Sequence, residues 1–301
     1  MSCPGACPGQ VWGGWGGVGW VSVPCPVSTL SLSEIARLEE SRQLAAVTEL
    51  APESRPVRSG GVMCRAAPGN WMNYATGLGM NGPVGIEELH ELVAFYEERG
   101  IEPRIEVCPF VDESLRAGLE ELGFVVRLFE LVFVRELEPG VRIEPIHVPG
   151  PEARIEVLDP SDDAMVRVCA DVTIPGFLPE GEQVPDDWFE MFVRSVRHPR
   201  TRTVLALVGD RVVGTASMEL SAPVGALFGA VTTPEMRGKG VQQALIAARL
   251  NMLIGHGAKL ASIGSRPGVA TERNVRRMGF KLAYVKLAMT RPGSGLKPVL
   301  G

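Results

Sequence analysis

The chain has 301 residues, enough for about two domains of ordinary size. Its 45% hydrophobic content supplies material for two cores, and a formal net charge of −5 argues against nucleic acid or an anionic membrane as the main partner. The six cysteines show no Cys-x-x-Cys spacing, and no apolar run is long enough to span a bilayer. We therefore expect a reduced, cytoplasmic protein without metal, nucleic acid or membrane partners.

The chain begins with a segment of unusual composition. Residues 1–26 are rich in Gly, Pro and Trp and show no periodicity, so we expect a disordered tail. Because folded-looking sequence follows at once, we hypothesise that translation starts near Val27. Residues 32–50 then predict one helix, and strands are expected near 60–67 and 70–78.

An internal repeat organises the rest of the chain. Residues 82–135 align without gaps with residues 238–291, and each segment predicts a helix, a strand, a short helix and a long alternating strand. The chain is therefore interpreted as two copies of one α/β unit. The expected boundaries are a first, degenerate unit at 27–136, a linker at 137–152, a second unit at 153–292 and a flexible tail at 293–301.

The second copy is the more complete at its start. Gly209-Asp210 is a hairpin turn signal between two of its strands. The expected elements are a strand at 153–159, helices at 161–175 and 185–197 around a polar loop, and strands at 202–208, 212–220 and 223–233.

The strongest local signal is a glycine-rich turn at the start of a predicted helix. Gly238 and Gly240 stand there beside the cations Arg237 and Lys239. The free N–H groups of a first helical turn and the helix dipole favour an anion, and glycine lets a phosphate approach the backbone. A P-loop would need Ser or Thr directly after Gly-Lys, and a dinucleotide fingerprint would need a third glycine where Gln243 stands.

Four features make the second unit similar to the GNAT acyltransferase superfamily. They are a strand ending in Val231-Thr232-Thr233-Pro234, the run Arg237-Gly238-Lys239-Gly240-Val241-Gln242, the downstream Arg273-Asn274, and Met278-Gly279-Phe280 before a final strand. Gln242 departs from the pattern, because the family prefers Gly or Ala at that position. With the repeat, the resemblance implies an α/β fold with a mixed sheet, built from two GNAT-like units in tandem.

The resemblance also implies a ligand and a reaction. The turn would hold the pyrophosphate of acetyl-CoA, with the pantetheine arm between strands at about 223–233 and 258–265. A monomer or homodimer would transfer the acetyl group to a primary amine of a small molecule or peptide. The residues expected at the acetyl-CoA site are Val231, Thr232, Thr233, Arg237, Gly238, Lys239, Gly240, Val241, Gln242, Gln243 and Asn274.

Catalytic groups are expected on the strands around this site. In the resembled family, backbone N–H groups such as those of Val231 or Thr232 meet the oxyanion or thioester carbonyl. The family's usual tyrosine acid is replaced here by Val275, which makes Tyr284 the candidate acid and Glu219 the candidate base. A packing role for Tyr284, a surface position for Glu219 and a water chain as base are the alternatives.

A loop at 174–189 falls where the family's acceptor-binding segment lies. Its carboxylates would attract a cationic amine, unless they only solvate the loop and start the next helix. They are Glu180, Glu182, Asp186 and Asp187.

The first unit carries a competing signal. Residues Gly77–Gly82 read Gly-x-Gly-x-x-Gly after a predicted strand, with Glu106 on the next one, which alone indicates a dinucleotide site. In the repeat alignment, however, Asn81 and Pro83 stand where the second unit has its two cations, and proline also removes a backbone donor. We favour a degenerate unit, and keep a dinucleotide-binding module and a non-catalytic acyl-CoA sensor as alternatives to the enzyme.

Overall fold

The computed structural model describes residues 30–147, 153–178, 182–185 and 187–299. The hypotheses about residues 1–26 and Val27 fall outside these ranges. Within the described part of the chain, no helix combines the length and the apolar character needed to cross a membrane.

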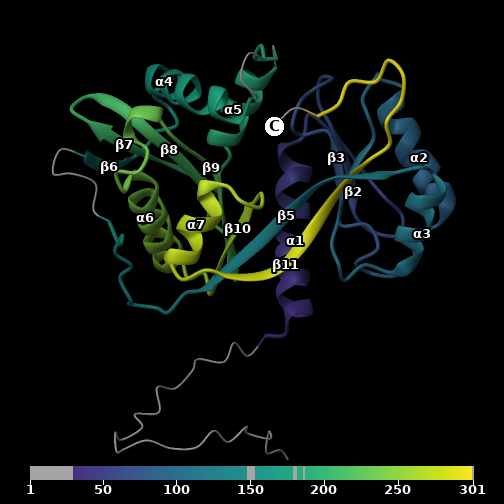
Figure 1. Cartoon of the computed structure of the whole chain (residues 1–301), viewed down its shortest axis with the longest axis horizontal. Coiled ribbons are helices and arrows are strands. Elements are labelled where there is room, and N and C mark those ends of the chain that lie inside the picture. The colour runs from purple at the N-terminus through teal and green to yellow at the C-terminus, as the bar shows by residue number, and fades with distance from the viewer. Residues whose placement is uncertain (1–29, 148–152, 179–181, 186, 300–301) are drawn as a thin grey trace, which may run out of the picture.

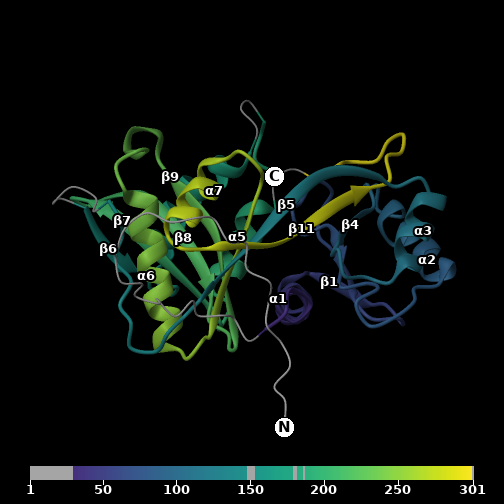
Figure 2. The same ribbon diagram turned by 60° about the horizontal axis from the view of Figure 1, so that its bottom comes forward.

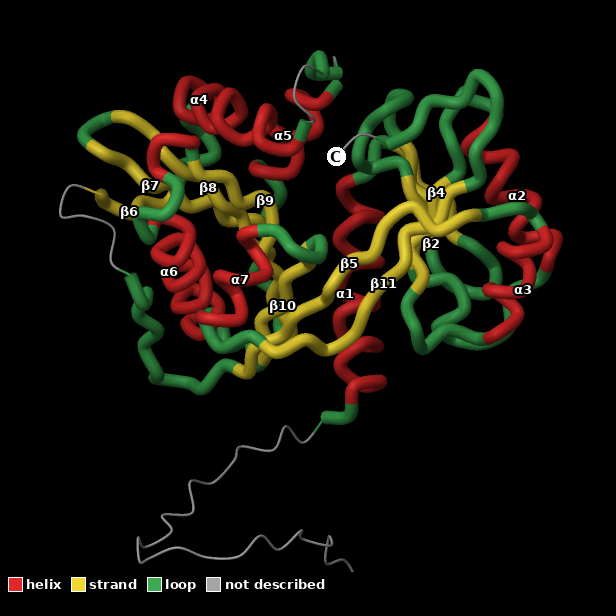
Figure 3. Tube along the Cα trace, in the orientation of Figure 1, coloured by secondary structure: helices red, strands yellow, loops and turns green. Residues whose placement is uncertain are grey.

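Both halves of the described chain contain helices and strands (Figures 1 and 3). The helices are α1 (Leu32–Leu50), α2 (Ile86–Glu97), α3 (Glu113–Glu121), α4 (Asp163–Thr173), α5 (Trp188–Val196), α6 (Val241–Gly255) and α7 (Ala270–Arg277), with 3-10 turns η1 (Ile174–Phe177) and η2 (Pro234–Met236). The strands are β1 (Glu53–Pro56), β2 (Val62–Arg65), β3 (Tyr74–Thr76), β4 (Arg104–Val107), β5 (Val125–Glu136), β6 (Ala153–Val157), β7 (Thr201–Val208), β8 (Arg211–Glu219), β9 (Val224–Thr232), β10 (Leu260–Ser265) and β11 (Lys281–Thr290).

The predicted repeat is confirmed at the level of secondary structure. One copy folds as α2-β4-α3-β5 and the other as α6-β10-α7-β11, in the same order of elements. The predicted first helix is also confirmed, and a capping box starts it, because Ser31 Oγ accepts the N–H of Glu34 while Glu34 accepts the N–H of Ser31. The short strand β1 was not predicted.

The strands form one eleven-stranded sheet in which the two copies exchange their final strands. The order is β1-β2-β3-β4-β11-β5-β10-β9-β8-β7-β6. Thus β5, from the first half of the chain, pairs with β10 of the second half, and β11 pairs with β4 of the first half. The two exchanged strands also pair with each other along most of their length and join the two halves at the centre (Figure 1). The mixed α/β fold with a large mixed sheet is confirmed, while the domain boundaries stay a prediction.

The exchanged strand β5 shows which helices cover which face of the sheet. Val132 and Val134 pack with Ile35 of α1, whereas Phe133 between them packs with Ile246 of α6 and Val275 of α7. Because successive side chains of a strand point to opposite faces, α1 lies on one face and α6 and α7 lie on the other. Figure 2 shows α1 seen nearly end-on beneath the crossing of β5 and β11.

Helix α4 lies on the same face as α1. Thr173 of α4 exchanges a hydrogen bond of 2.6 Å with Thr215 of β8, and Glu219, four residues further along that strand, meets Arg42 of α1. This face of the second unit therefore carries polar side chains at Thr215 and Glu219, beside an apolar cluster of α4 and α5 with β7 and β8. The α6 face carries a separate apolar core.

The strand exchange yields a stability prediction. Phe133 is fully buried in the core of the second unit although it belongs to the first half of the sequence. We expect Phe133→Ala to lower the free energy of unfolding by about 3–5 kcal/mol. We also expect the substitution to speed amide hydrogen exchange in α6 more than in α2. If β5 instead packed only within the first half, exchange in α2 would be the more affected.

A matched control lies on the same strand. Phe129 is 51% exposed, and Phe129→Ala should change the free energy of unfolding by no more than about 0.5 kcal/mol. Urea unfolding and hydrogen exchange on both variants test the assignment, and equal effects on α2 and α6 would contradict it.

Candidate active site

The predicted phosphate turn forms at the start of α6. Gly240 is the N-cap residue with φ of +81°, and Gly238 has φ of +75°, a region that side chains other than glycine rarely adopt. Arg237, Gly238 and Lys239 are exposed. Among the described residues, no acceptor takes the N–H groups of Gly238, Gly240, Val241, Gln242 and Gln243. The turn thus presents a row of free donors between two solvated cations.

The linker passes directly beside this turn. The carbonyl oxygen of His147 lies 2.5 Å from the position that a Cβ on Gly240 would occupy, so no larger residue fits there. The N–H of His147 donates to Gln243 Oε1 at 3.0 Å, and Asn251 exchanges two hydrogen bonds with the backbone of Ile143. Gly240 therefore serves the packing of the linker as well as the shape of the turn.

The departure from the family pattern at Gln242 has a structural partner. Its side chain donates to Thr271 Oγ1 at 3.1 Å and accepts from Asn274 Nδ2, both in α7. Gln243 also donates to Asn274 at 3.4 Å. The three amide side chains tie the first turn of α6 to α7, so Asn274 lies beside the turn with its side chain already engaged, and its role in binding acetyl-CoA stays a prediction.

The strands β9 and β10 part beside this turn. Their parallel pairing runs from Leu260–Val224 to Ile263–Leu227 and ends there, although β10 stays paired with β5 through Ser265. The N–H of Thr233 donates to Val213 of β8. Because N–H groups alternate sides along a strand, the N–H of Thr232 faces away from β8 and into the gap. Arg237 Nε reaches the carbonyl of Thr232 at 3.4 Å, which places its cation at the same gap.

A buried arginine that the sequence did not reveal supports β9 from the α6 side. Arg249 is fully buried, and its Nη1 donates to Ser217 at 2.8 Å and to Phe228 at 3.3 Å, where β8 and β9 shift register. Burial lowers the pKa of Arg249 to about 9, and its Nη2 has no partner among the described residues. The guanidinium fixes the irregular stretch of β9 that opens the gap. Its position in an apolar helix offered no signal that it would be internal.

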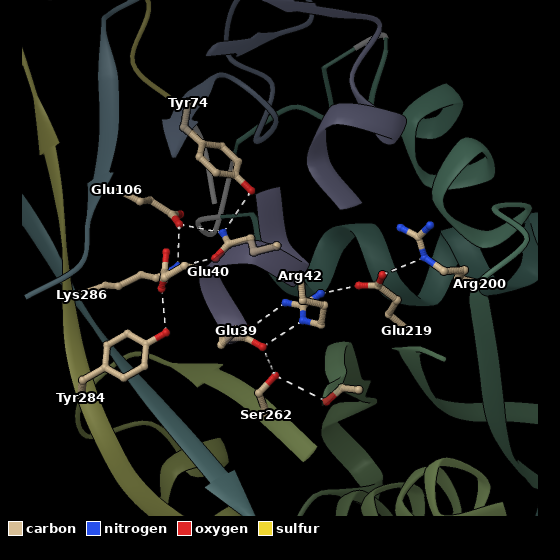
Figure 4. Close-up of polar contacts among 12 residues, drawn as sticks. Glu39, Glu40, Arg42, Tyr74, Glu106, Arg200, Glu219, Ser262, Tyr284 and Lys286 are labelled. Carbon is tan, nitrogen blue, oxygen red and sulfur yellow. Dashed lines mark hydrogen bonds and ion pairs between the residues drawn. The ribbon is translucent and has the colours of Figure 1, made fainter. Parts of the chain in front are cut away.

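The candidate base Glu219 lies in a buried network along α1 (Figure 4). One carboxylate oxygen accepts from Arg42, and the other accepts from Arg200 at 2.9 Å. Both oxygens of this carboxylate are therefore already engaged by guanidinium groups of the protein. The structure thus places Glu219 in a structural ion-pair cluster rather than on the surface.

The candidate acid Tyr284 lies in the same network, on the first-unit side of α1 (Figure 4). Its hydroxyl donates to Glu40 at 2.6 Å, and Lys286 contacts the same carboxylate oxygen at 3.0 Å. Burial, then the charge of Glu40, raise the pKa of Tyr284 far above its ordinary value. The hydroxyl already donates within the protein and holds its proton tightly, so the geometry favours the packing alternative for this residue.

Part of the acidic loop holds the two halves together. Asp187 accepts from Asn70 at 2.8 Å and from the N–H of Ala67 at 3.2 Å, both in the first half of the chain. Glu182 is exposed, and Glu180 and Asp186 lie outside the described residues. An acceptor-binding role for this loop stays a prediction.

The competing turn of the first unit is filled by its own side chains. A Cβ on Gly79 would lie 3.1 Å from Val111 and 3.3 Å from Leu115, so α3 packs where a phosphate would approach. At the start of α2, Glu88 accepts the N–H of Gly85 at 3.1 Å. A carboxylate already satisfies this helix start and adds negative charge, which disfavours a dinucleotide.

Comparisons with known proteins agree with this arrangement. Residues 169–280 match the acetyltransferase (GNAT) family, so the chain carries a GNAT domain in its second half. No curated protein matches the chain.

The fold is similar to solved structures along most of their length. A GCN5-related N-acetyltransferase from Kribbella flavida has a TM-score of 0.65 at 18% identity, covering 87% of this chain and 97% of that one. A tandem GNAT protein from the clavulanic acid biosynthesis pathway has a TM-score of 0.54 at 12% identity, covering 88% and 98%. A GCN5-related N-acetyltransferase from Sphaerobacter thermophilus has a TM-score of 0.52 at 17% identity, covering 73% of each chain. At these identities the likeness establishes the fold.

The buried carboxylate of Glu39 depends on Arg42. Burial alone would raise the pKa of Glu39, but the charge and hydrogen bond of Arg42, with help from Ser262 and Lys286, lower it overall. A lowered pKa in the folded state contributes stability above the unfolded pKa of about 4.5, and this contribution is lost as the pH falls through the folded value.

Arg42→Met tests this dependence. It leaves Glu39 and Glu219 buried without their shared guanidinium, so we expect the free energy of unfolding to fall by about 3–5 kcal/mol at pH 7. Without Arg42, burial raises the pKa of Glu39, so the deficit should shrink as the pH falls from 7 towards about 4.5, because protonation removes the uncompensated charge. The control is Arg37→Met, an exposed arginine of the same helix, for which we expect little change. A deficit independent of pH in urea unfolding would contradict the assignment.

Proposed function

We propose that the protein is an N-acetyltransferase that moves an acetyl group from acetyl-CoA to a primary amine of a small molecule or peptide. The observation that carries the proposal is the turn before α6, with its free backbone donors and exposed cations, beside the gap between β9 and β10. The GNAT domain match covers both features.

The residues present fit the chemistry of acetyl-CoA. The free N–H groups of Gly238, Gly240, Val241, Gln242 and Gln243 suit the pyrophosphate, as do the cations of Arg237 and Lys239. From there the pantetheine arm would follow the unpaired edge of β9 past Thr232. The N–H of Thr232 would donate to the pantetheine arm, and acetyl-CoA would supply the thioester nearer the point where β9 and β10 part.

The acceptor would reach the gap from the opposite face of the sheet. Helices α6 and α7 cover one face, and the other face of the second unit carries the polar side chains of β8, among them Thr215 and Ser217. An amine approaching from this side would meet the thioester at the gap without displacing the apolar core under α6 and α7.

Experiment can distinguish two other functions from the proposed one. A non-catalytic acyl-CoA sensor would use the same turn without turnover. A dinucleotide-binding module at Gly77–Gly82 is disfavoured because α3 fills that turn and Glu88 occupies the start of α2.

The acetyl-CoA site is tested by thermal unfolding. We expect acetyl-CoA at a hundredfold excess over its Kd to stabilise the protein by about 2.7 kcal/mol, and NAD, NADP and FAD to have no saturable effect. Arg237→Glu should abolish the acetyl-CoA shift because the carboxylate repels the pyrophosphate. Lys259→Glu, an exposed substitution beyond the other end of α6, should retain it. An Arg237→Glu variant that keeps the full shift would place the site elsewhere.

Turnover separates the enzyme from the sensor. We expect the protein to release free thiol from acetyl-CoA in the presence of one or more primary amines from a broad panel, at a rate that rises with pH as the amine loses its proton. Mass spectrometry of the product should show one added acetyl group. Tight binding of acetyl-CoA without thiol release from any amine would favour the sensor.

A further inference from the structure

The strand exchange brings a carboxylate of the first unit to the gap of the second. Glu130 lies on β5 beside β10, and a Cβ on Gly264 would collide with Glu130 Oε1, so the carboxylate lies directly over that glycine. Gly264 is the first residue of β10 after its pairing with β9 ends at Ile263–Leu227. The carboxylate therefore sits at the point where the two strands part.

Glu130 lies on the face of the sheet from which the acceptor would arrive. Side chains of β5 alternate between faces, and Val132 and Val134 pack towards α1. Glu130 lies two residues before Val132 and therefore shares that face. It is only partly exposed to solvent.

This carboxylate differs from its buried neighbours because it is unpaired. Among the described residues it takes no hydrogen bond and no ion pair. The ammonium group of Lys286 is taken by Glu40 at 3.0 Å and Glu106 at 3.3 Å, and Arg104 lies 3.9 Å from Glu106. Glu130 is left as a negative charge without a partner. The charged groups that act on it are Glu40 of α1, Glu106 and Arg104 of β4 and Lys286 of β11.

A second carboxylate beside Lys286 also keeps an oxygen without a donor. Glu40 is 2% exposed, and its Oε2 has no partner among the described residues although Oε1 accepts from Tyr284 and contacts Lys286. A buried carboxylate oxygen without a donor is costly, and an ammonium group is the donor that carboxylates favour.

We propose that Glu130 is the general base that takes a proton from the acceptor amine, and that the acceptors are amines that arrive as ammonium cations. The inference rests on the proposed acetyltransferase function. An ammonium acceptor would give one proton to Glu130, and its nitrogen would bond to the acetyl carbon as the carbon–sulfur bond breaks. A second proton of the amine neutralises the departing thiolate, and Glu130 returns its proton to solvent.

The electrostatic surroundings suit this role. Burial, then the charges of Glu106 and Glu40, raise the pKa of Glu130, while Lys286 and Arg104 lower it, and together they bring it to about 7. A base with a pKa near the working pH combines a useful deprotonated fraction with adequate basicity. By contrast, both carboxylate oxygens of Glu219 are taken by guanidinium groups of Arg42 and Arg200.

Glu130→Gln tests the assignment in the full chain. With an amine that wild type acetylates, we expect kcat at pH 7.5 to fall by about 10²- to 10⁴-fold, while the thermal shift with acetyl-CoA is retained. The kcat of wild type should rise with pH around an apparent pKa near 7, and the kcat of the variant should lack this rise. Glu136→Gln, an exposed residue of the same strand, should stay within about twofold of wild type.

Stability separates a lost base from a damaged fold. Because the folded-state pKa of Glu130 is raised, its ionisation costs stability as the pH rises from about 4.5 to about 7. The melting temperature of Glu130→Gln at pH 8 should therefore equal or exceed that of wild type. If Glu130→Gln leaves both kcat and its pH dependence unchanged, the assignment of Glu130 as the general base is wrong, and the acetyltransferase function still stands. Absence of thiol release by wild type itself would overturn both.

Discussion

The pairing of β5 with β10 and of β11 with β4 is the constraint on which the rest of the molecule depends. Each half closes its sheet with a strand from the other, so neither core is complete without both halves. Phe133 shows this directly, since it lies in the first half of the sequence and packs between α6 and α7. A gap at β9 can stay open because β10 is held from its other side by β5.

Helix α1 lies at the centre of this exchange and carries charges into the interior. Glu39, Glu40 and Arg42 are all on its inner face and meet residues of both halves. Buried charges are costly to desolvate and are tolerated where each finds a partner. Because Glu39 meets Ser262 in the second unit while Glu40 meets Lys286 of the exchanged β11, the network also fixes how the helix lies across the sheet.

The sequence predicted the elements well and their partners poorly, and the reason is physical. Periodicity reports which face of a segment is apolar, so the repeat of helix, strand, helix and strand was visible in both halves. It does not report which strand lies beside β5, because an alternating strand suits either neighbour equally. The turn at Gly238 and Gly240 was predictable because its chemistry is local. The role of Glu130 was not predictable, because it depends on the contact with Gly264, which forms only when the strands are exchanged.

The same contrast explains the two candidate catalytic residues. Tyr284 and Glu219 were chosen by their place along a strand, and their strands form as predicted. What the sequence could not show is that α1 would cross the sheet at this point and engage both side chains, through Glu40 and Arg42. A helix of mixed charge reads as a surface helix when no partner is known.

The asymmetry between the two units follows from what each contributes. The first unit has Asn81 and Pro83 where the second has its cations, has α3 packed above Gly79, and places a carboxylate at the start of α2. Its turn is therefore built for packing, whereas the turn of the second unit leaves its donors free. The first unit also supplies the outer strands on which β11 rests and the strand β5 that borders the gap. It thus contributes to the gap through the sheet it completes, because β5 carries Glu130 to the place where β9 and β10 part.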